Sequence, residues 1–267
     1  MSTVAALRSV WDAIATLAAG LTEAEWRSPT GCPGWEVRDL VAHMAGTELS
    51  LAGENPPDPP PHYPAHVRNP IGEFNERWVL QLRGLPREEL VARFRASTAI
   101  RLEALEALTE AEWAAPSWTP AGPGSYGDFM RIRVFDCWAH ERDIRWAIGR
   151  PGGLDGPWVD MALSIPRSTL PRLVARTARA PEGTVVEWLL EGQPERRWWV
   201  AVREGRGVEL DGYQGEPTVR LRGGVDDFVM RVCGRTDPVS GEPLGQTTIE
   251  GDAELGWRVV EGMALPI

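Results

Sequence analysis

Two histidines of this chain each end the same five-residue pattern, Asp-x-x-Ala-His. The pattern runs from Asp39 to His43 and again from Asp136 to His140. Both copies lie in stretches with helical periodicity, and residues four apart on a helix share one face with Cβ atoms about 5–6 Å apart. A carboxylate and an imidazole placed in this way can bind one metal ion. The repeated pattern therefore predicts a metal site between two helices.

A longer string is duplicated in front of each histidine pattern. Leu-Thr-Glu-Ala-Glu-Trp occupies 21–26 and recurs letter for letter at 108–113. In both copies the threonine can cap the start of a helix while the second glutamate reaches back to it, which is a capping box. Two interpretations stay open: internal duplication of a helix-pair unit around a metal, and chance recurrence of a common helix-start string.

Three assignments of the metal ligands fit the spacing. In the first, His43, Asp136 and His140 bind the ion, and Asp39 supports them or starts a helix. In the second, internal symmetry makes Asp39 the carboxylate ligand in place of Asp136. In the third there is no metal, Asp136 and His140 form an ordinary core pair, and His43 is a partly buried histidine. Two imidazoles and one carboxylate leave coordination positions open, as in catalytic metal sites, and zinc or another divalent ion would fit.

Apolar periodicity predicts the helices that carry these residues. We expect helices at 4–20, 36–51, 71–82, 87–108 and 128–148. Prolines exclude a helix interior or a central strand from 53–70, so this segment and the Pro/Gly-rich 116–127 are predicted loops. The inward face of the last helix is expected to contain Phe129, Ile132, Asp136, His140, Ile144 and Ala147. Because buried polar groups need partners, the two polar members of this face must be satisfied by something.

The second half of the chain has a different pattern. Alternating, Trp- and Val-rich segments predict antiparallel strands at 184–190, 197–203, 207–210, 218–222 and 247–250, with helices at 225–232 and from Asp252 to Val260. We therefore expect an α+β protein of two domains, a helical one at 1–153 and a smaller one with an antiparallel sheet and helices at 154–267.

Composition excludes several classes of partner and of chemistry. The 267 residues have a net charge of −10, which argues against nucleic acid and anionic membranes because both attract basic surfaces. All 28 basic residues are arginine, so lysine Schiff-base chemistry and a P-loop lysine are excluded. The three cysteines form neither a disulfide framework nor a Cys-x-x-Cys zinc site. We interpret Cys32, Cys137 and Cys233 as small buried residues.

No apolar stretch approaches the roughly 20 residues of a membrane span, and the first residues lack the layout of a signal peptide. We expect a cytoplasmic monomer that acts on a small molecule.

Several motifs carry a resemblance to a known family. They are Pro-Thr-Gly-Cys-Pro-Gly-Trp-Glu-Val-Arg-Asp-Leu-Val-Ala-His at 29–43, Trp-Ala-His-Glu-Arg-Asp-Ile at 138–144 and Gly-Arg-Pro at 149–151. They resemble the mycothiol-dependent maleylpyruvate isomerase family, whose first domain is a DinB-like four-helix bundle. Pro217–Gly223, Gly234-Arg235 and Ile249–Ala253 are similar to the family's second, sterol-carrier-like α+β domain.

The resemblance implies a site and a chemistry. In the family, zinc is held by a histidine matching His43 and by a Glu-x-x-x-His pair matching Asp136 and His140; this chain has the shorter aspartate. Since Asp136 matches the family's carboxylate and Asp39 falls in the first turn of a helix, where negative charge is favoured, we expect Asp136 to be the ligand. The implied cosubstrate is the thiol mycothiol, which zinc deprotonates.

Addition of the thiolate to an activated double bond allows rotation, and elimination then gives the other geometric isomer. Without elimination, the protein would be an S-transferase, and the metal motif does not distinguish the two. Arg235 is the candidate to hold an acidic substrate, beside Arg220 and Arg222. Two alternatives remain: a DinB-like metallohydrolase that activates water, and a non-catalytic zinc-bearing binding or regulatory module.

Overall fold

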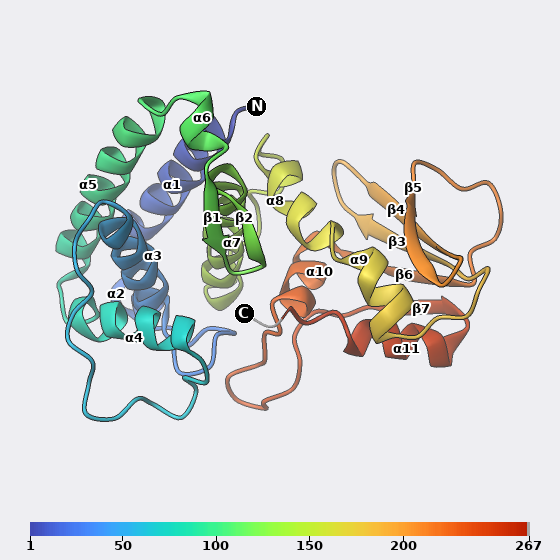
Figure 1. Cartoon of the computed structure of the whole chain (residues 1–267). Helices are drawn as coiled ribbons and strands as arrows, with labels where there is room; N and C mark the ends of the chain where they lie inside the picture. Colours follow the sequence, from blue (N-terminus) through green and yellow to red (C-terminus); the bar gives the residue numbers. More distant parts are fainter. Residues whose placement is uncertain (266–267) are drawn as a thin grey trace. The chain divides into compact units, whose positions relative to one another are not determined.

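The computed structural model describes residues 1–265, which divide into two compact units. The first comprises 1–151 and 157–162, and the second comprises 152–156 and the residues from Leu163 on. Helices dominate the first unit, and a sheet with helices forms the second (Figure 1). The predicted α+β class is confirmed. The assignment of 1–153 and 154–267 to separate domains stays a prediction. Within residues 1–265, no helix has the length and apolarity needed to cross a membrane.

Four long helices frame the first unit. They are α1 (Thr3–Ala19), α3 (Val37–Leu51), α5 (Arg87–Glu106) and α7 (Tyr126–Ala147). α1 and α3 each pack against both α5 and α7, and α4 (Pro70–Leu82) packs against α3 (Figure 1). The core is apolar, with Trp11, Phe94 and Trp138 almost fully buried. The helices predicted from periodicity are confirmed, and their ends lie within two residues of those expected.

The duplicated hexapeptide forms the same structure twice. Glu23–Trp26 is α2 and Glu110–Trp113 is α6, and each is a single turn whose preceding threonine makes a capping box with the second glutamate. Burial differs, because Trp26 is 2 % exposed while Trp113 is half-buried. The string therefore starts a short helix in both places, as its capping chemistry predicts.

The segment 116–127, expected to be a loop, contains a hairpin. β1 (Pro116–Thr119) pairs antiparallel with β2 (Gly122–Ser125). The Thr119 hydroxyl closes the turn by donating to the Gly122 carbonyl at 2.7 Å and accepting from the Ala121 amide at 3.1 Å. Most of the prolines and glycines of this segment lie in the two strands, which are too short to show alternation. Ser125 then caps α7, which begins at Tyr126, two residues before the expected start at 128.

The buried face of α7 is rotated from the one expected. Phe129, Ile132, Asp136 and Ala147 are only half-buried, whereas Arg133, Glu141 and Arg142 are buried. Periodicity alone misplaced the face because two buried arginines and a glutamate occupy positions that hydrophobicity assigns to solvent. Asp136 therefore lies at the edge of the core instead of inside it.

The second unit is built on a five-stranded sheet of order β5-β4-β3-β6-β7. The strands are β3 (Val185–Glu191), β4 (Arg196–Arg203), β5 (Arg206–Leu210), β6 (Val219–Gly224) and β7 (Thr248–Gly251). The helices are α8 (Val159–Arg167), α9 (Leu170–Arg172), α10 (Val225–Val232) and α11 (Ala253–Glu261), and a π-helical turn spans Leu173–Thr177. The first residues of α8 belong to the first unit.

One strand pair corrects the sequence prediction. β6 lies parallel to β3, while the other neighbouring strands are antiparallel. The connection after β5 crosses back past β4 and β3, so that β6 runs beside β3 in the same direction. Alternation within a strand predicts its buried face but contains no information about the direction of its neighbour.

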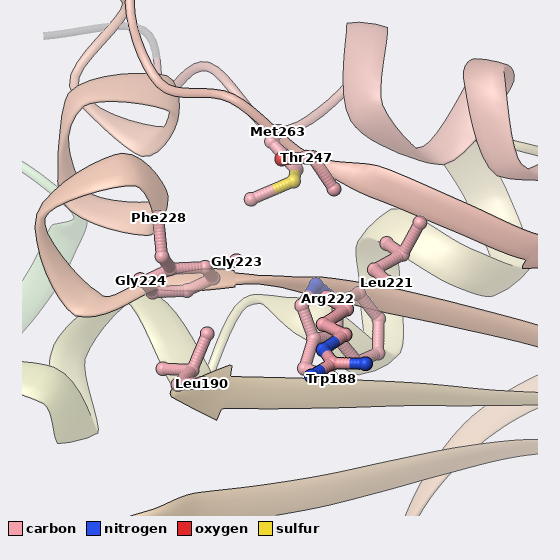
Figure 2. A pocket seen from close by; sticks show the side chains of 9 residues that line it. All are labelled: Trp188, Leu190, Leu221, Arg222, Gly223, Gly224, Phe228, Thr247 and Met263. Carbon is pink, nitrogen blue, oxygen red and sulfur yellow. The ribbon is translucent and has the colours of Figure 1, made fainter. Parts of the chain in front are cut away.

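A small cavity lies in the second unit between β3, β6 and the end of α11. Trp188, Leu190, Leu221, Phe228 and Met263 line it with the backbone of Gly223 and Gly224 (Figure 2). Its volume is about 10 Å³, roughly the least that holds one water molecule. We assign no ligand to it.

Candidate metal centre

The three residues predicted as metal ligands lie together in the first unit. His43 comes from the middle of α3, and Asp136 and His140 come from successive turns of α7. His43 Nε2 is 3.5 Å from Asp136 Oδ2, and His140 Nε2 is 3.7 Å from Asp136 Oδ1. One donor atom of each residue lies within 4.8 Å of the others. The structure thus brings the predicted group together across two helices.

These distances fit a shared ion better than direct hydrogen bonds. A hydrogen bond of this kind is usually 2.7–3.2 Å long, and both contacts are longer. A tetrahedral ion with bonds of about 2.0–2.1 Å holds its ligand atoms roughly 3.3 Å apart. Both histidines present Nε2 to the carboxylate, so each can offer a lone pair to one point. The donor set therefore fits a divalent metal.

Asp136 is also held by a buried arginine. Arg133 contacts Asp136 Oδ2 through Nη1 and donates to Glu48 Oε1 from Nε at 3.1 Å and from Nη2 at 2.7 Å. Arg101 approaches Glu48 Oε2 at 3.4 Å and donates to the Tyr126 hydroxyl at 2.6 Å. Charge on α3, α5 and α7 is thereby balanced inside the core. The partner that Asp136 needed is Arg133, which leaves Oδ1 directed at His140.

The electrostatic environment favours the ligand forms of these side chains. Burial lowers the pKa of His43 to about 4, against a smaller opposing effect of Asp136. Burial would raise the pKa of Asp136, but Arg133 and the two histidines outweigh it and hold that pKa well below its usual range. A neutral imidazole and an ionised carboxylate are the forms that bind metals. Near neutral pH, His43 and Asp136 are therefore ready to receive a cation.

Trp35 forms a wall of the site. Its ring centroid is 5.3 Å from that of His43 and 6.3 Å from that of His140. Trp35 Nε1 donates to Glu76 Oε2 at 2.9 Å, and His66 Nε2 is 3.1 Å from the same oxygen. Glu76 belongs to α4 and His66 to the proline-rich loop. Trp35 is therefore held by two segments that carry none of the candidate metal ligands.

Gly34 permits the loop to approach this closely. Its φ is +78°, and an added Cβ would lie 2.3 Å from Nδ1 of His66. A side chain at this position would strain the backbone and push the loop away from Trp35. Gly34 of the Gly-Cys-Pro-Gly motif therefore has a structural role beside the candidate metal site.

Asp39 lies apart from the histidines. It is fully buried as the third residue of α3, where it accepts from the Glu36 amide at 2.9 Å and from Arg83 at 3.1 and 2.6 Å. Among the described residues it joins no group able to hold a metal. α3 begins only two residues before Asp39, whereas Asp136 lies in the middle of α7, so the same pattern lies in two different environments.

Sequence reasoning missed a second cluster that shares His140. His140 Nδ1 is 2.9 Å from Asp143 Oδ2, and the Cys32 thiol contacts the same oxygen at 3.3 Å. All three residues are buried, and their donor atoms also lie within 4.8 Å of one another. The spacing of His140 and Asp143, three residues apart on one helix, is a signal that could have revealed their contact. Nothing in the sequence brings Cys32 to them.

The arginines expected to hold a substrate belong to the second unit. Arg220 is bound by Glu187 at 2.6 Å and Glu250 at 3.0 Å, and Arg222 pairs with Glu191 at 2.5 Å. These ion pairs cross the sheet and occupy both guanidinium groups. Arg235 follows α10, is half-buried, and donates to the Cys233 carbonyl at 3.1 Å. Its role toward a substrate stays a prediction.

The two other cysteines differ in burial. Cys137 is fully buried, accepts from Trp11 Nε1 at 3.3 Å, and has its pKa raised to about 12 by burial. Cys233 is only half-buried. The interpretation as small core residues therefore fits Cys137 better than Cys233.

Comparison with known proteins bears on the whole arrangement. The family model for the mycothiol maleylpyruvate isomerase N-terminal domain matches residues 7–145, which include the three candidate ligands. A crystal structure of the mycothiol-dependent maleylpyruvate isomerase is similar with a TM-score of 0.55 and 17% identity, covering 93% of this chain and 91% of that one. The crystal structure of a mutant of the same enzyme is similar with a TM-score of 0.53 and 17% identity, and the match covers 90% of this chain and 92% of that one.

No curated protein matches the chain. At 17% identity the two crystal structures show a common fold and no more, whereas the family model spans more than half of the sequence. The family is named for an isomerase, and the expected relation to an isomerase-like enzyme is confirmed at that level. The chain belongs to the mycothiol maleylpyruvate isomerase N-terminal domain family, as its motifs predicted.

Proposed function

We propose that this protein is a divalent-metal enzyme that uses mycothiol to attack an electrophilic small molecule, as an isomerase or an S-transferase. The observation that carries the proposal is the convergence of His43, Asp136 and His140 at the spacing of ligands to one ion. Family membership supports it, because the family is named for a mycothiol-dependent reaction. Zinc is the first candidate for the ion, since it accepts two imidazoles and a carboxylate.

The side chains have distinct roles in this proposal. His43, His140 and Asp136 would hold the ion, and three protein ligands leave room for an added thiol. Arg133 holds Asp136 from behind, and Trp35 limits the approach of water from one side. When bound, the ion would lower the pKa of the added thiol below its free value of about 8.5, so that thiolate is present near neutral pH.

The first unit is itself a poor source of the nucleophile. The sequence has no lysine, and the Cys137 thiol is buried with a pKa near 12. Cys32 is buried, and its thiol donates a hydrogen bond to Asp143. A nucleophile from outside, bound at the open positions of the ion, is consistent with all three observations.

The substrate class follows from the thiol chemistry. Addition of a thiolate to a carbon–carbon double bond conjugated to a carbonyl forms a carbon–sulfur bond and gives a single bond that can rotate. Expulsion of the thiolate returns the other isomer, whereas protonation of the adduct gives a thioether. We propose Arg235 as a residue that binds an acidic group of the substrate. Because Asp136 is one methylene shorter than the family's glutamate, we expect a substrate other than maleylpyruvate.

A titration of cobalt-loaded protein with mycothiol tests this function. We expect a sulfur-to-cobalt charge-transfer band that grows in proportion to bound mycothiol. Glutathione at the same concentration should give little or no band. Absence of both binding and the band at millimolar thiol would contradict the proposal. Hydrolysis of esters or amides by thiol-free metalloprotein would then support the hydrolase, and inactivity would support a binding module.

A further inference from the structure

His140 contacts a different carboxylate with each ring nitrogen. Nε2 faces Asp136 Oδ1 at 3.7 Å, and Nδ1 lies 2.9 Å from Asp143 Oδ2. Asp143 is 1 % exposed, so this second contact is shielded from water. The first distance is too long for a strong hydrogen bond, and the second is ideal for one.

The chemistry of the two groups decides where the imidazole proton is. An ionised carboxylate can only accept hydrogen bonds, and a neutral imidazole has one donor nitrogen and one acceptor nitrogen. With Asp143 as the acceptor, the short contact favours the proton on Nδ1, so that Nε2 keeps the lone pair that faces Asp136 and His43. Cys32 Sγ approaches the same Asp143 oxygen at 3.3 Å, so its thiol hydrogen is also directed there.

The two clusters that share His140 exclude each other as metal sites. A metal bound by Cys32, Asp143 and Nδ1 of His140 would require the lone pair to be on Nδ1. The proton would then be on Nε2, and His140 could not join His43 and Asp136 as a ligand. The hydrogen-bond geometry favours the arrangement in which the ion lies on the Asp136 side.

The other histidine has no comparable support. Nδ1 of His43 is buried and makes no hydrogen bond among the described residues. Of the two imidazoles, only that of His140 therefore has a carboxylate at Nδ1. A carboxylate that fixes a ligand histidine typically increases metal affinity by roughly 10–100-fold.

We propose that Asp143 is a positioning residue of the metal centre, which fixes His140 as an Nε2 ligand, and that Cys32 donates to Asp143 without binding the ion. This inference rests on the proposed metal site. It does not depend on metal binding for its first test, because the proton position can be measured in metal-free protein.

The first experiment measures the tautomer by nitrogen-15 NMR of histidine-labelled, metal-free protein. The chain has 4 histidines, so His140→Ala identifies the His140 signals by difference. We expect Nδ1–H in the unaltered protein and Nε2–H in Asp143→Asn, whose amide can donate to Nδ1. Nε2–H in the unaltered protein would overturn the proposal, whether or not a metal binds.

The second experiment measures zinc affinity by competition with a chelator. We expect Asp143→Asn to bind zinc roughly 10–100-fold more weakly. Asp39→Asn is the matched control, since it alters a buried aspartate of the other Asp-x-x-Ala-His pattern, and its zinc affinity should stay within about twofold of the unaltered value. Unchanged affinity in Asp143→Asn, with zinc bound normally by the unaltered protein, would refute the positioning role and leave the proposed function standing.

A third measurement concerns Cys32 and stays informative if Asp143→Asn does not fold. Cobalt-loaded protein without added thiol should show no sulfur-to-cobalt charge-transfer band, and Cys32→Ser, which keeps a donor to Asp143, should retain zinc. A band in the unaltered protein that disappears in Cys32→Ser would overturn the proposal, because the ion would then lie on the Asp143 side of His140.

Discussion

The short side chain of Asp136 lies against three others, those of Arg133, His43 and His140. Oδ2 contacts Arg133 and lies 3.5 Å from His43, while Oδ1 faces His140. Arg133 shares Glu48 with Arg101, and its charge is the largest of those that hold the pKa of Asp136 low. An ionised Asp136 between two imidazoles is therefore the form of this side chain that a cation would meet.

Removal of either histidine ligand should remove the metal. We expect His43→Ala and His140→Ala each to abolish stoichiometric binding, because two remaining protein ligands hold a divalent ion poorly. His62→Ala is the control, since His62 is exposed in the proline-rich loop and its loss should change nothing. Elemental analysis of the purified proteins gives the metal content. Full metal content in a His43→Ala, His140→Ala double variant would contradict the site.

Substitutions of the two aspartates of the repeated pattern should have different effects. Asp136→Ala is expected to weaken zinc binding by at least tenfold, in addition to any loss of stability from the broken Arg133 ion pair. Asp39→Ala should keep zinc and lose about 1–3 kcal/mol of stability, because the amide of Glu36 and the guanidinium of Arg83 lose a buried acceptor. Chelator competition and urea unfolding measure the two effects. The opposite assignment of effects would favour a symmetric site with Asp39 as the ligand.

At the scale of helices, Glu48 connects three of the four long elements. It lies on α3 and binds Arg133 of α7 and Arg101 of α5, and all three side chains are at most 5 % exposed. This network fixes the rotation and height of α7 relative to α3. The distance between His43 and Asp136 depends on that register, so the network supports the site through the packing of helices.

Glu48→Gln should therefore destabilise the protein strongly. Two buried arginines would lose their shared countercharge, a change that typically costs about 3–5 kcal/mol. Glu103→Gln, an exposed glutamate on α5, is the control and should cost less than about 0.5 kcal/mol. Urea unfolding at neutral pH compares the two. A cost for Glu48→Gln as small as that of the control would mean that the network does not hold the helices.

At the scale of the whole molecule, the candidate ligands all belong to the first unit, and Arg235 belongs to the second. We expect metal binding to need only the first unit and turnover to need both. A chain ended after Arg167 keeps α8, whose buried Val159 and Ala162 belong to the first unit. It should bind one divalent ion and be inactive with mycothiol.

A chain ended after Gly153 lacks those two buried residues and should bind metal with a lower melting temperature than the longer chain. Calorimetry and metal analysis of both chains check these expectations, and Arg235→Ala in the full chain tests whether loss of one side chain explains the loss of turnover. Full activity with mycothiol in either shortened chain would show that the second unit contributes nothing to catalysis.

The local features of this protein could be predicted from its sequence because they depend on spacing along one element. Helical periodicity predicted α1, α3, α4, α5 and α7, and the capping string predicted the starts of α2 and α6. Residues four apart on a helix share a face whatever surrounds them, so Asp136 and His140 were expected to act together. The family followed from motifs that are likewise continuous in sequence.

Tertiary structure decided which side chains from different elements meet. The packing of α3 on α7 brings His43 to Asp136 and Glu48 to Arg133, and the loop before α3 brings Cys32 to Asp143. The parallel pairing of β3 with β6 likewise depends on the path of the chain between strands. Each of these contacts joins residues far apart in sequence through the rotation and register of packed elements, which spacing within a single element does not determine.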